Sequence, residues 1–299
     1  MGSNWQAAWR RLRKEGPRSL VSLAIRTAER TAERVCLRAC SPETYWTLAS
    51  RYYRRREVRD VDGYDVPTDP FRVLWVDPDD IVRHSNREYP PWRGGWRLCG
   101  RVADGDWDRP SDEYHHPPSF EDRLEFAAFR AHFVDGVPWG ETEFLARKID
   151  KVENGGTSRA GEDREEILEY WTKYDELYEE ISETGYDTQR ERVTSGIETK
   201  RFPQAIGDEI AIDIARDGEP LFVDGSHRLS IAKLLDLDSV PTVCFYRHEE
   251  WMRIREAVYR ATTVDELGET ARRRLQADHP DLRDLRDSFT YGGEHPQYR

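Results

Sequence analysis

Five consecutive residues have the types and spacing best suited to chemistry, and they lie where an apolar run gives way to a helical pattern. Residues 221–223 are apolar and predict a strand, and the helical pattern begins at residue 226. A helix N-terminus attracts anions because it presents unpaired N–H groups and a partial positive charge. The junction therefore predicts a site for a phosphate group, carried by a nucleotide or a phosphorylated substrate. Its residues are Asp224, Gly225, Ser226, His227 and Arg228, the last four being the predicted phosphate-binding set.

Each polar side chain of the junction has a predicted role. The planar guanidinium of Arg228 can hold phosphate oxygens, and Ser226 with the first helical N–H groups can hold another. His227 either hydrogen-bonds phosphate or orients the turn. Asp224 either takes a proton from an acceptor hydroxyl or binds Mg²⁺. The structural alternative is that Asp224 accepts N–H bonds from its own turn and that Ser226 is simply an N-cap.

A phosphoryl-transfer site also needs a second acidic group that faces Asp224. The acidic turn at residues 104–108 offers carboxylates that can act as a base or hold Mg²⁺. The alternative is that this turn is a tight, solvated surface feature. In order of preference the candidates are Asp106 and Asp108, then Asp79 and Asp80.

The elements around the junction must position these residues, and their order is informative. Residues 210–214 alternate in the manner of a strand, 216–219 predict a hairpin turn, and 240–246 predict a further strand. Together with the Asp-Gly-x-His-Arg junction, the span from Glu209 to Tyr246 resembles the ParB/sulfiredoxin superfamily. A weaker similarity lies upstream, at Phe71–Ile81 and at Leu177, Ile181 and Gly185.

The resemblance implies an α+β fold with a mixed sheet, and it implies a choice among activities. Sulfiredoxins carry a reactive Cys where this chain has Ser226, so their thiol chemistry is excluded. Partition ParB proteins bind CTP and DNA and carry a helix-turn-helix after this domain. Residues 250–299 instead hold nine Arg and ten acidic residues, which is no basic DNA-binding surface. An archaeal free-serine kinase has the same type of corner, which implies phosphoryl transfer from ATP or another nucleotide, with Mg²⁺, to a small hydroxyl.

Three regions are predicted along the chain. Residues 1–60 form a basic amphipathic helical arm. Residues 61–250 form the ParB/sulfiredoxin-like core, with a large helical and irregular insertion at about 84–165. Residues 251–299 form C-terminal helices and a frayed tail.

The arm differs in charge from the rest of the chain. It holds 14 Arg or Lys and 6 Asp or Glu, a net charge of +8, so the remaining residues carry −20 of the total of −12. Trp5 and Trp9 beside arginines suit an anionic membrane surface. The alternative is that the arm docks on the acidic body of the same chain.

The amino-acid composition indicates the cellular environment of the protein. Of the 46 basic residues only six are Lys, and 58 residues are acidic, a balance typical of proteins from a high-salt cytoplasm. The four Cys show no zinc-type spacing, and no run of apolar residues is long enough for a transmembrane helix. The sequence predicts a cytoplasmic protein, which is peripheral at the membrane only if the arm binds an anionic surface instead of docking on the body of the chain.

The preferred function is nucleotide-dependent phosphoryl transfer to a small-molecule or lipid-linked hydroxyl. One alternative is a regulatory nucleotide-binding module without catalysis. The other is ParB-like nucleic-acid binding or cleavage, against which the charge of −20 on residues 61–299 argues, because phosphate backbones need basic surface.

Overall fold

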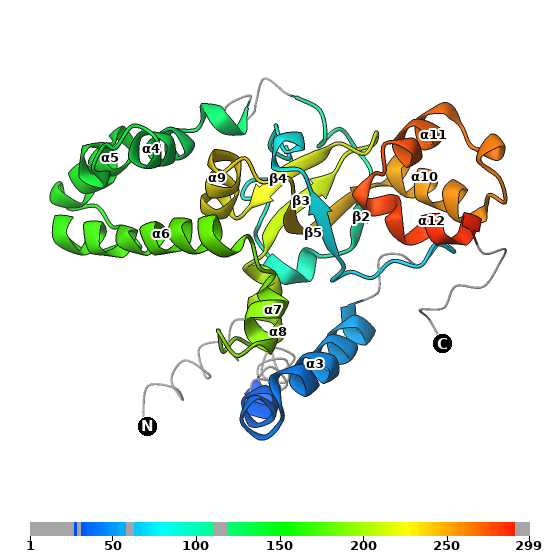
Figure 1. Cartoon of the computed structure of the whole chain (residues 1–299), viewed down its shortest axis with the longest axis horizontal. Coiled ribbons are helices and arrows are strands. Elements are labelled where there is room, and N and C mark those ends of the chain that lie inside the picture. The colour runs from blue at the N-terminus through cyan, green and yellow to red at the C-terminus, as the bar shows by residue number, and fades with distance from the viewer. Residues whose placement is uncertain (1–26, 29–30, 58–62, 111–118, 291–299) are drawn as a thin grey trace, which may run out of the picture.

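The computed structural model describes residues 27–28, 31–57, 63–110 and 119–290. Within them the chain is a mixed α+β protein, in which helices surround a five-stranded mixed sheet (Figure 1). The strands are β1 (Val73–Val76), β2 (Arg101–Ala103), β3 (Ile210–Ile214), β4 (Pro220–Asp224) and β5 (Val240–His248). The helices are α3 (Pro42–Glu57), α4 (Leu124–Phe133), α5 (Glu143–Glu153), α6 (Arg164–Thr184), α7 (Gln189–Thr194), α8 (Phe202–Gly207), α9 (Ser226–Leu234), α10 (Glu249–Arg260), α11 (Glu269–Gln276) and α12 (Arg283–Thr290).

The long strand β5 organises the sheet. Its first half pairs antiparallel with β1, and its second half pairs parallel with the short β2. β3 lies parallel beside β5, and β4 returns antiparallel to β3 through the predicted hairpin. Because Ala211 pairs with Asp224, the end of β4 lies beside the start of β3. The predicted α+β class with a mixed sheet is confirmed at this level.

Side chains of the central strands alternate between two hydrophobic clusters, as the pleat requires. Ile210, Ile212 and Ile214 of β3 belong to the cluster formed with α9, α10 and α12. Ala211 and Val243 belong to the cluster formed with α3 and α8 on the opposite face. Because both faces are covered, all five residues of β3 are buried.

The predicted insertion at about 84–165 divides into two parts. Residues 101–103 form strand β2 of the sheet, whereas the described residues from 119 onward begin a helical layer. Helices α4, α5 and α6 share a third hydrophobic cluster, which includes Ile231 of α9. In Figure 1 these green helices lie beside α9, on the side of the sheet away from α10 to α12. The layer continues past the predicted boundary at residue 165, because α6 packs in the same cluster and ends at Thr184, before Gly185.

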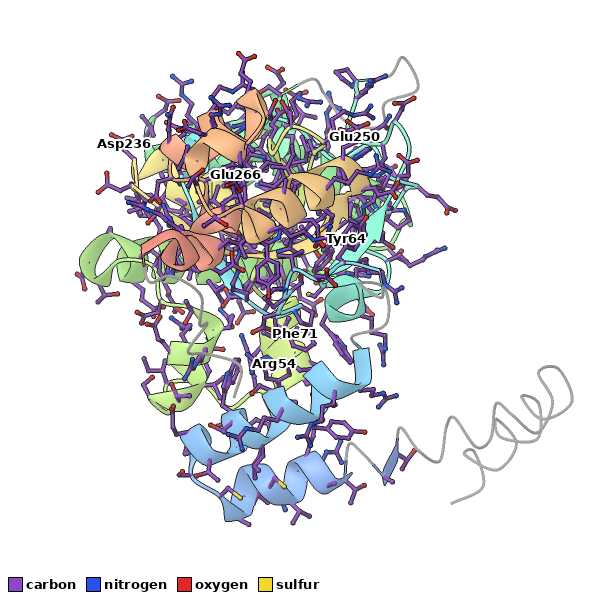
Figure 2. The ribbon with its side chains drawn as sticks, turned by 90° about the vertical axis from the view of Figure 1, so that its right-hand side faces the viewer. Arg54, Tyr64, Phe71, Asp236, Glu250 and Glu266 are labelled. Carbon is purple, nitrogen blue, oxygen red and sulfur yellow. The ribbon has the colours of Figure 1, made fainter. Side chains whose placement is uncertain are left out.

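The described part of the predicted arm packs on the body through α3. The Phe202 backbone N–H donates to the Tyr45 hydroxyl at 2.6 Å, and the ring of Tyr53 stacks on that of Phe202 at 5.5 Å. In Figure 2 the α3 helix lies below the body, with Arg54 near its point of contact. Trp5 and Trp9 lie outside the described residues. No helix in the described ranges has both the length and the apolar character needed to cross a bilayer.

The C-terminal helices are fastened to the sheet by a buried charge cluster. Asp281 has no solvent exposure and accepts hydrogen bonds from Arg247 of β5 at 2.7 and 2.8 Å. Arg72 also donates to it at 2.7 Å, and Arg255 of α10 lies 3.3 Å away. These arginines hold the pKa of Asp281 well below its ordinary value, although burial opposes them.

Candidate functional site

The predicted junction is a tight corner between β4 and α9, here called the α9 corner (residues 224–228). Gly225 is the N-cap of α9, in the left-handed conformation at φ 90°. A Cβ at this position would lie 3.0 Å from the Cα of Ile210, so glycine allows both the conformation and the close approach to β3. Ser226 is therefore the first helical residue and not the N-cap, which corrects the structural alternative for this residue.

Asp224 ends β4 with its side chain turned into the corner. Its Oδ1 accepts a hydrogen bond from the Gly225 N–H at 2.8 Å, as the structural alternative predicts. Although the residue reaches solvent, the surrounding protein partly desolvates its carboxyl and raises the pKa of Asp224, while the Gly225 N–H opposes the shift. A carboxylate with a raised pKa beside a helix N-terminus remains suited to proton transfer.

His227 is held on both sides of its ring. Its Nε2 donates to Glu125 at 2.7 Å, and its Nδ1 lies within hydrogen-bond distance of the Tyr174 hydroxyl, at 3.1 Å. The imidazole also stacks on the Tyr174 ring at a centroid distance of 4.4 Å. With both nitrogens engaged, His227 orients the corner, which is the second of the two roles predicted for it.

Glu125 is the group that fastens the helical layer to the α9 corner. It lies in the first turn of α4, is 8% exposed, and also accepts from Arg123 at 2.6 Å. Burial alone would raise the pKa of Glu125. The hydrogen bond and charge of His227, with the charge of Arg123, outweigh burial and lower it to about 2. The sequence pattern did not single out this residue, because a Glu in the first turn of a helix is ordinary.

Gly225, His227 and Arg228 of the α9 corner line a pocket of about 430 Å³, here called the corner pocket, which is walled on the other side by α6. Asp224 and Ser226, the other polar residues of the corner, adjoin these residues in the chain but do not line the pocket. Arg228 lines it and donates one N–H to the carbonyl of Asp208, which leaves most of its five N–H groups for a ligand. Four of the lining residues are cationic or can become so: Lys173, Arg192, His227 and Arg228. Three are acidic: Glu176, Glu180 and Asp208.

Two of the pocket cations differ in how strongly they are already engaged. Arg192 of α7 is held by Glu180 and, at 2.7 Å, by Glu198, so its charge is largely neutralised. Lys173 of α6 lies over the ring of Tyr170 at 3.3 Å and has no carboxylate partner in the part of the chain that the structure describes. Lys173 and Arg228 are therefore the cations most available to an anion.

The structure does not place Asp106 and Asp108 opposite Asp224. Arg216, in the β3–β4 hairpin turn, donates to Asp106 at 2.8 Å and to Asp108 at 2.7 Å. That turn is the end of the hairpin remote from Asp224. Asp108 is 4% exposed, and its bonds to Arg216 lower its pKa despite burial. The predicted catalytic or Mg²⁺ role of these two residues at the corner is wrong, because the acidic turn clamps the far end of the hairpin.

The second pair of candidates is also remote from the corner. Asp79 lies 3.4 Å from Lys233, which belongs to the last turn of α9, whereas the corner is its first turn. Asp80 lines a different pocket, beside His279 and Arg274.

Two other acids occupy the place predicted for a second acidic group. Asp208 lines the corner pocket and binds Lys200 at 3.0 Å. Glu209 follows it, is 2% exposed, and accepts from the Gln189 N–H at 2.6 Å. Burial raises the pKa of Glu209 to about 8, against the opposing charge of Arg228. The sequence feature that could have identified Asp208 and Glu209 is their position directly before β3. That strand pairs with β4, which ends at Asp224.

The donor set at the corner fits Mg²⁺ in the manner typical of phosphate sites. Mg²⁺ takes hard oxygen ligands, often one or two carboxylates together with substrate phosphates. Asp208 and Asp224 are close enough to influence each other's charge and supply such oxygens. No cluster of three or more His, Cys, Asp or Glu that could hold a metal occurs among the described residues.

Comparison with protein-family models, with curated proteins and with solved structures finds no match for this chain. The geometry of the corner pocket is therefore what supports a function.

Proposed function

We propose that this protein binds a nucleotide at the α9 corner and transfers a phosphoryl group from it to a small hydroxyl-bearing acceptor. The observation that carries the proposal is that the N-terminus of α9 opens into a 430 Å³ pocket that also holds Arg228 and Lys173. A volume of this order is within the range of small-molecule sites. Oriented helix N–H groups beside two available cations form a favourable environment for phosphate.

The corner residues have complementary roles in this proposal. Phosphoryl transfer depends mainly on positioning and on neutralising phosphate charge. Arg228 and the first N–H groups of α9 hold the phosphate oxygens, while His227, fixed by Glu125, orients the turn. Asp224 takes the proton of the acceptor hydroxyl. Mg²⁺, held by Asp208 together with the phosphate oxygens of the nucleotide, would supply further charge neutralisation.

The same corner supports the proposal of a ParB/sulfiredoxin-like fold. The order of β3, hairpin, β4, α9 and β5 agrees with the order that the resemblance implies. The helical layer of α4 to α6 is then an addition to that fold. It supplies Lys173 and Tyr174 to the pocket, and Glu125 to His227.

Calorimetric titration of ATP, ADP and CTP with Mg²⁺, in KCl at which the protein is folded, tests the proposal. Arg228→Ala should weaken nucleotide binding by about tenfold or more, because a charge-assisted phosphate contact is lost. Arg253→Ala is the matched control. It removes the same charge from an exposed position on α10, which lies to the right of the sheet in Figure 1, whereas α9 lies to its left.

The absence of any nucleotide affinity at millimolar concentration would refute the proposal, and so would an equal loss of affinity in both variants. Asp224→Asn separates catalysis from binding, because it should abolish turnover of the nucleotide and leave its affinity largely intact. Retained binding without turnover in the wild type would favour the regulatory module. A gel shift with DNA that weakens steeply with salt would favour nucleic-acid binding.

A further inference from the structure

An apolar groove lies in the arm, away from the corner pocket. It has a volume of about 400 Å³ and runs between the helix at residues 31–39 and α3. Its walls are almost entirely apolar, and Glu33, the acidic residue at its edge, is already bound to Tyr45 and Arg201. The groove is here called the arm groove and is lined by, among others, Ala32, Cys36, Leu48, Ala49 and Tyr52.

Large apolar side chains are exposed along the arm groove. Leu48 is 50% exposed and Tyr52 48%, and both line the groove. Leu48 and Tyr52 are four residues apart on α3 and therefore lie on one face of the helix. Contiguous exposed apolar surface of this kind usually marks a site of interaction with a protein or a membrane.

The charge around the arm groove indicates which partner fits it. Residues 31–57 hold six Arg and three Glu, a net charge of +3 in a chain whose total is −12. Four of these arginines are exposed and pair with no acid among the described residues: Arg34, Arg38, Arg51 and Arg55. Arg51 and Arg55 each follow a groove residue by three positions, so they flank the apolar face of α3.

We propose that the arm groove and its flanking arginines dock on the surface of an anionic lipid bilayer. A helical surface with an apolar face bordered by cationic side chains lies in the interface of a membrane, with the apolar face toward the acyl chains. Anionic headgroups attract each flanking arginine. In Figure 2 the blue helices of the arm lie at the lower edge of the molecule, below the body.

Two other occupants of the groove fit the charge less well. A second copy of the chain would place its own flanking arginines against the flanking arginines of the first copy. The repulsion between these like charges opposes such a dimer. The preceding residues 1–26 hold six Arg or Lys and one acid, so they too are strongly cationic. An anionic surface satisfies both the apolar groove and the arginines.

Flotation of the full-length protein with vesicles tests this proposal, at the lowest KCl concentration at which circular dichroism shows the protein folded. The vesicles contain either phosphatidylcholine alone or equal parts of phosphatidylcholine and phosphatidylglycerol. The wild type should float with the anionic vesicles and remain behind with the neutral ones. Raising the KCl concentration should weaken binding, because salt screens the attraction of exposed charges.

Two variants and two matched controls identify the surface. Leu48→Glu and the double variant Arg51→Glu/Arg55→Glu should each lower partitioning into anionic vesicles by about tenfold or more. Val264→Glu and the double variant Arg253→Glu/Arg273→Glu are the controls. They place the same new charges at exposed positions beyond the sheet, and they should bind vesicles like the wild type.

Several results would overturn the proposal. They are failure of the wild type to float, equal flotation with neutral and anionic vesicles, and wild-type partitioning of Leu48→Glu. A dimer that Leu48→Glu converts to a monomer, without vesicle binding, would assign the groove to a second copy. Loss of flotation on deletion of residues 1–26 but not in Leu48→Glu would assign the surface to that segment. Nucleotide binding at the corner pocket does not depend on these residues, so the two proposals fail separately.

Discussion

Replacing Glu125 with Gln probes the link between the helical layer and the α9 corner. Glu125→Gln keeps the shape of the side chain but removes the charge that holds His227 and Arg123 at 2.7 and 2.6 Å. Burial raises the pKa of Glu125, but His227 and Arg123 lower it from 4.5 to about 2. Each pKa unit corresponds to about 1.36 kcal/mol, so the lowered pKa of Glu125 stabilises the folded protein by about 3 kcal/mol at neutral pH. The side chain is 11% exposed, so screening by solvent takes away little of it.

The sign of the pH dependence follows from the lowered pKa. An acid whose pKa is depressed on folding stabilises the folded state above its unfolded pKa, and this stabilisation is lost as pH falls through the folded value. The wild type should therefore exceed Glu125→Gln by about 3 kcal/mol near pH 7. The difference should shrink by about 1 kcal/mol between pH 5 and pH 3.5.

Urea unfolding followed by tryptophan fluorescence measures these free energies, with linear extrapolation at each pH. Glu121→Gln is the matched control, because its side chain is 56% exposed and lies 3.4 Å from Lys233. Because the Glu121 carboxylate is exposed and Asp79 also lies 3.4 Å from Lys233, this replacement should cost about 1 kcal/mol or less. If Glu125→Gln is no less stable than Glu121→Gln, the reasoning about the buried Glu125–His227 pair is refuted.

Three further changes test other parts of the structure by the same unfolding measurement. Gly225→Ala should lower the free energy of unfolding by about 1–2 kcal/mol, because φ at this position is positive and the new Cβ would meet Ile210. The control is Gly207→Ala, which should lower it by nothing, because no atom lies within 4 Å of the new Cβ. Asp281→Asn should cost about 3–5 kcal/mol by leaving buried arginines unpaired, and the exposed Asp278→Asn much less; equal losses would contradict the buried cluster. Because burial raises the pKa of Glu209 to about 8, wild-type stability should fall as pH rises from about 4.5 to 8, and Glu209→Gln should flatten that slope. An unchanged slope would show that Glu209 ionises normally in the folded protein.

Local signals in the sequence were sufficient for the corner itself. The apolar run, the Asp-Gly pair and the helical pattern after it predict a strand, a tight turn and a helix, and the structure has β4, Gly225 as N-cap and α9. The hairpin before the corner and β5 after it were also predictable, because period-2 alternation and turn residues act over a few neighbouring positions. These signals also sufficed for the α+β class.

The partners of the corner were not predictable, because they depend on which segments pack together. Asp106 and Asp108 are suitable acids by type, yet Arg216 draws them to the far end of the hairpin. Glu125 is separated from His227 by about a hundred residues of chain. No local sequence pattern indicates that the two side chains meet in the folded protein.

The Asp-Gly-Ser-His-Arg sequence by itself determined the strand end, the tight turn and the helix start, since the backbone there follows from residues adjacent in the chain. Tertiary structure alone decided that His227 is fixed by Glu125 and Tyr174, that Arg228 and Lys173 share one pocket, and that the predicted acids lie elsewhere. The physical reason is that the buried ion pairs and packed clusters joining α4 and α6 to α9 arise between distant segments.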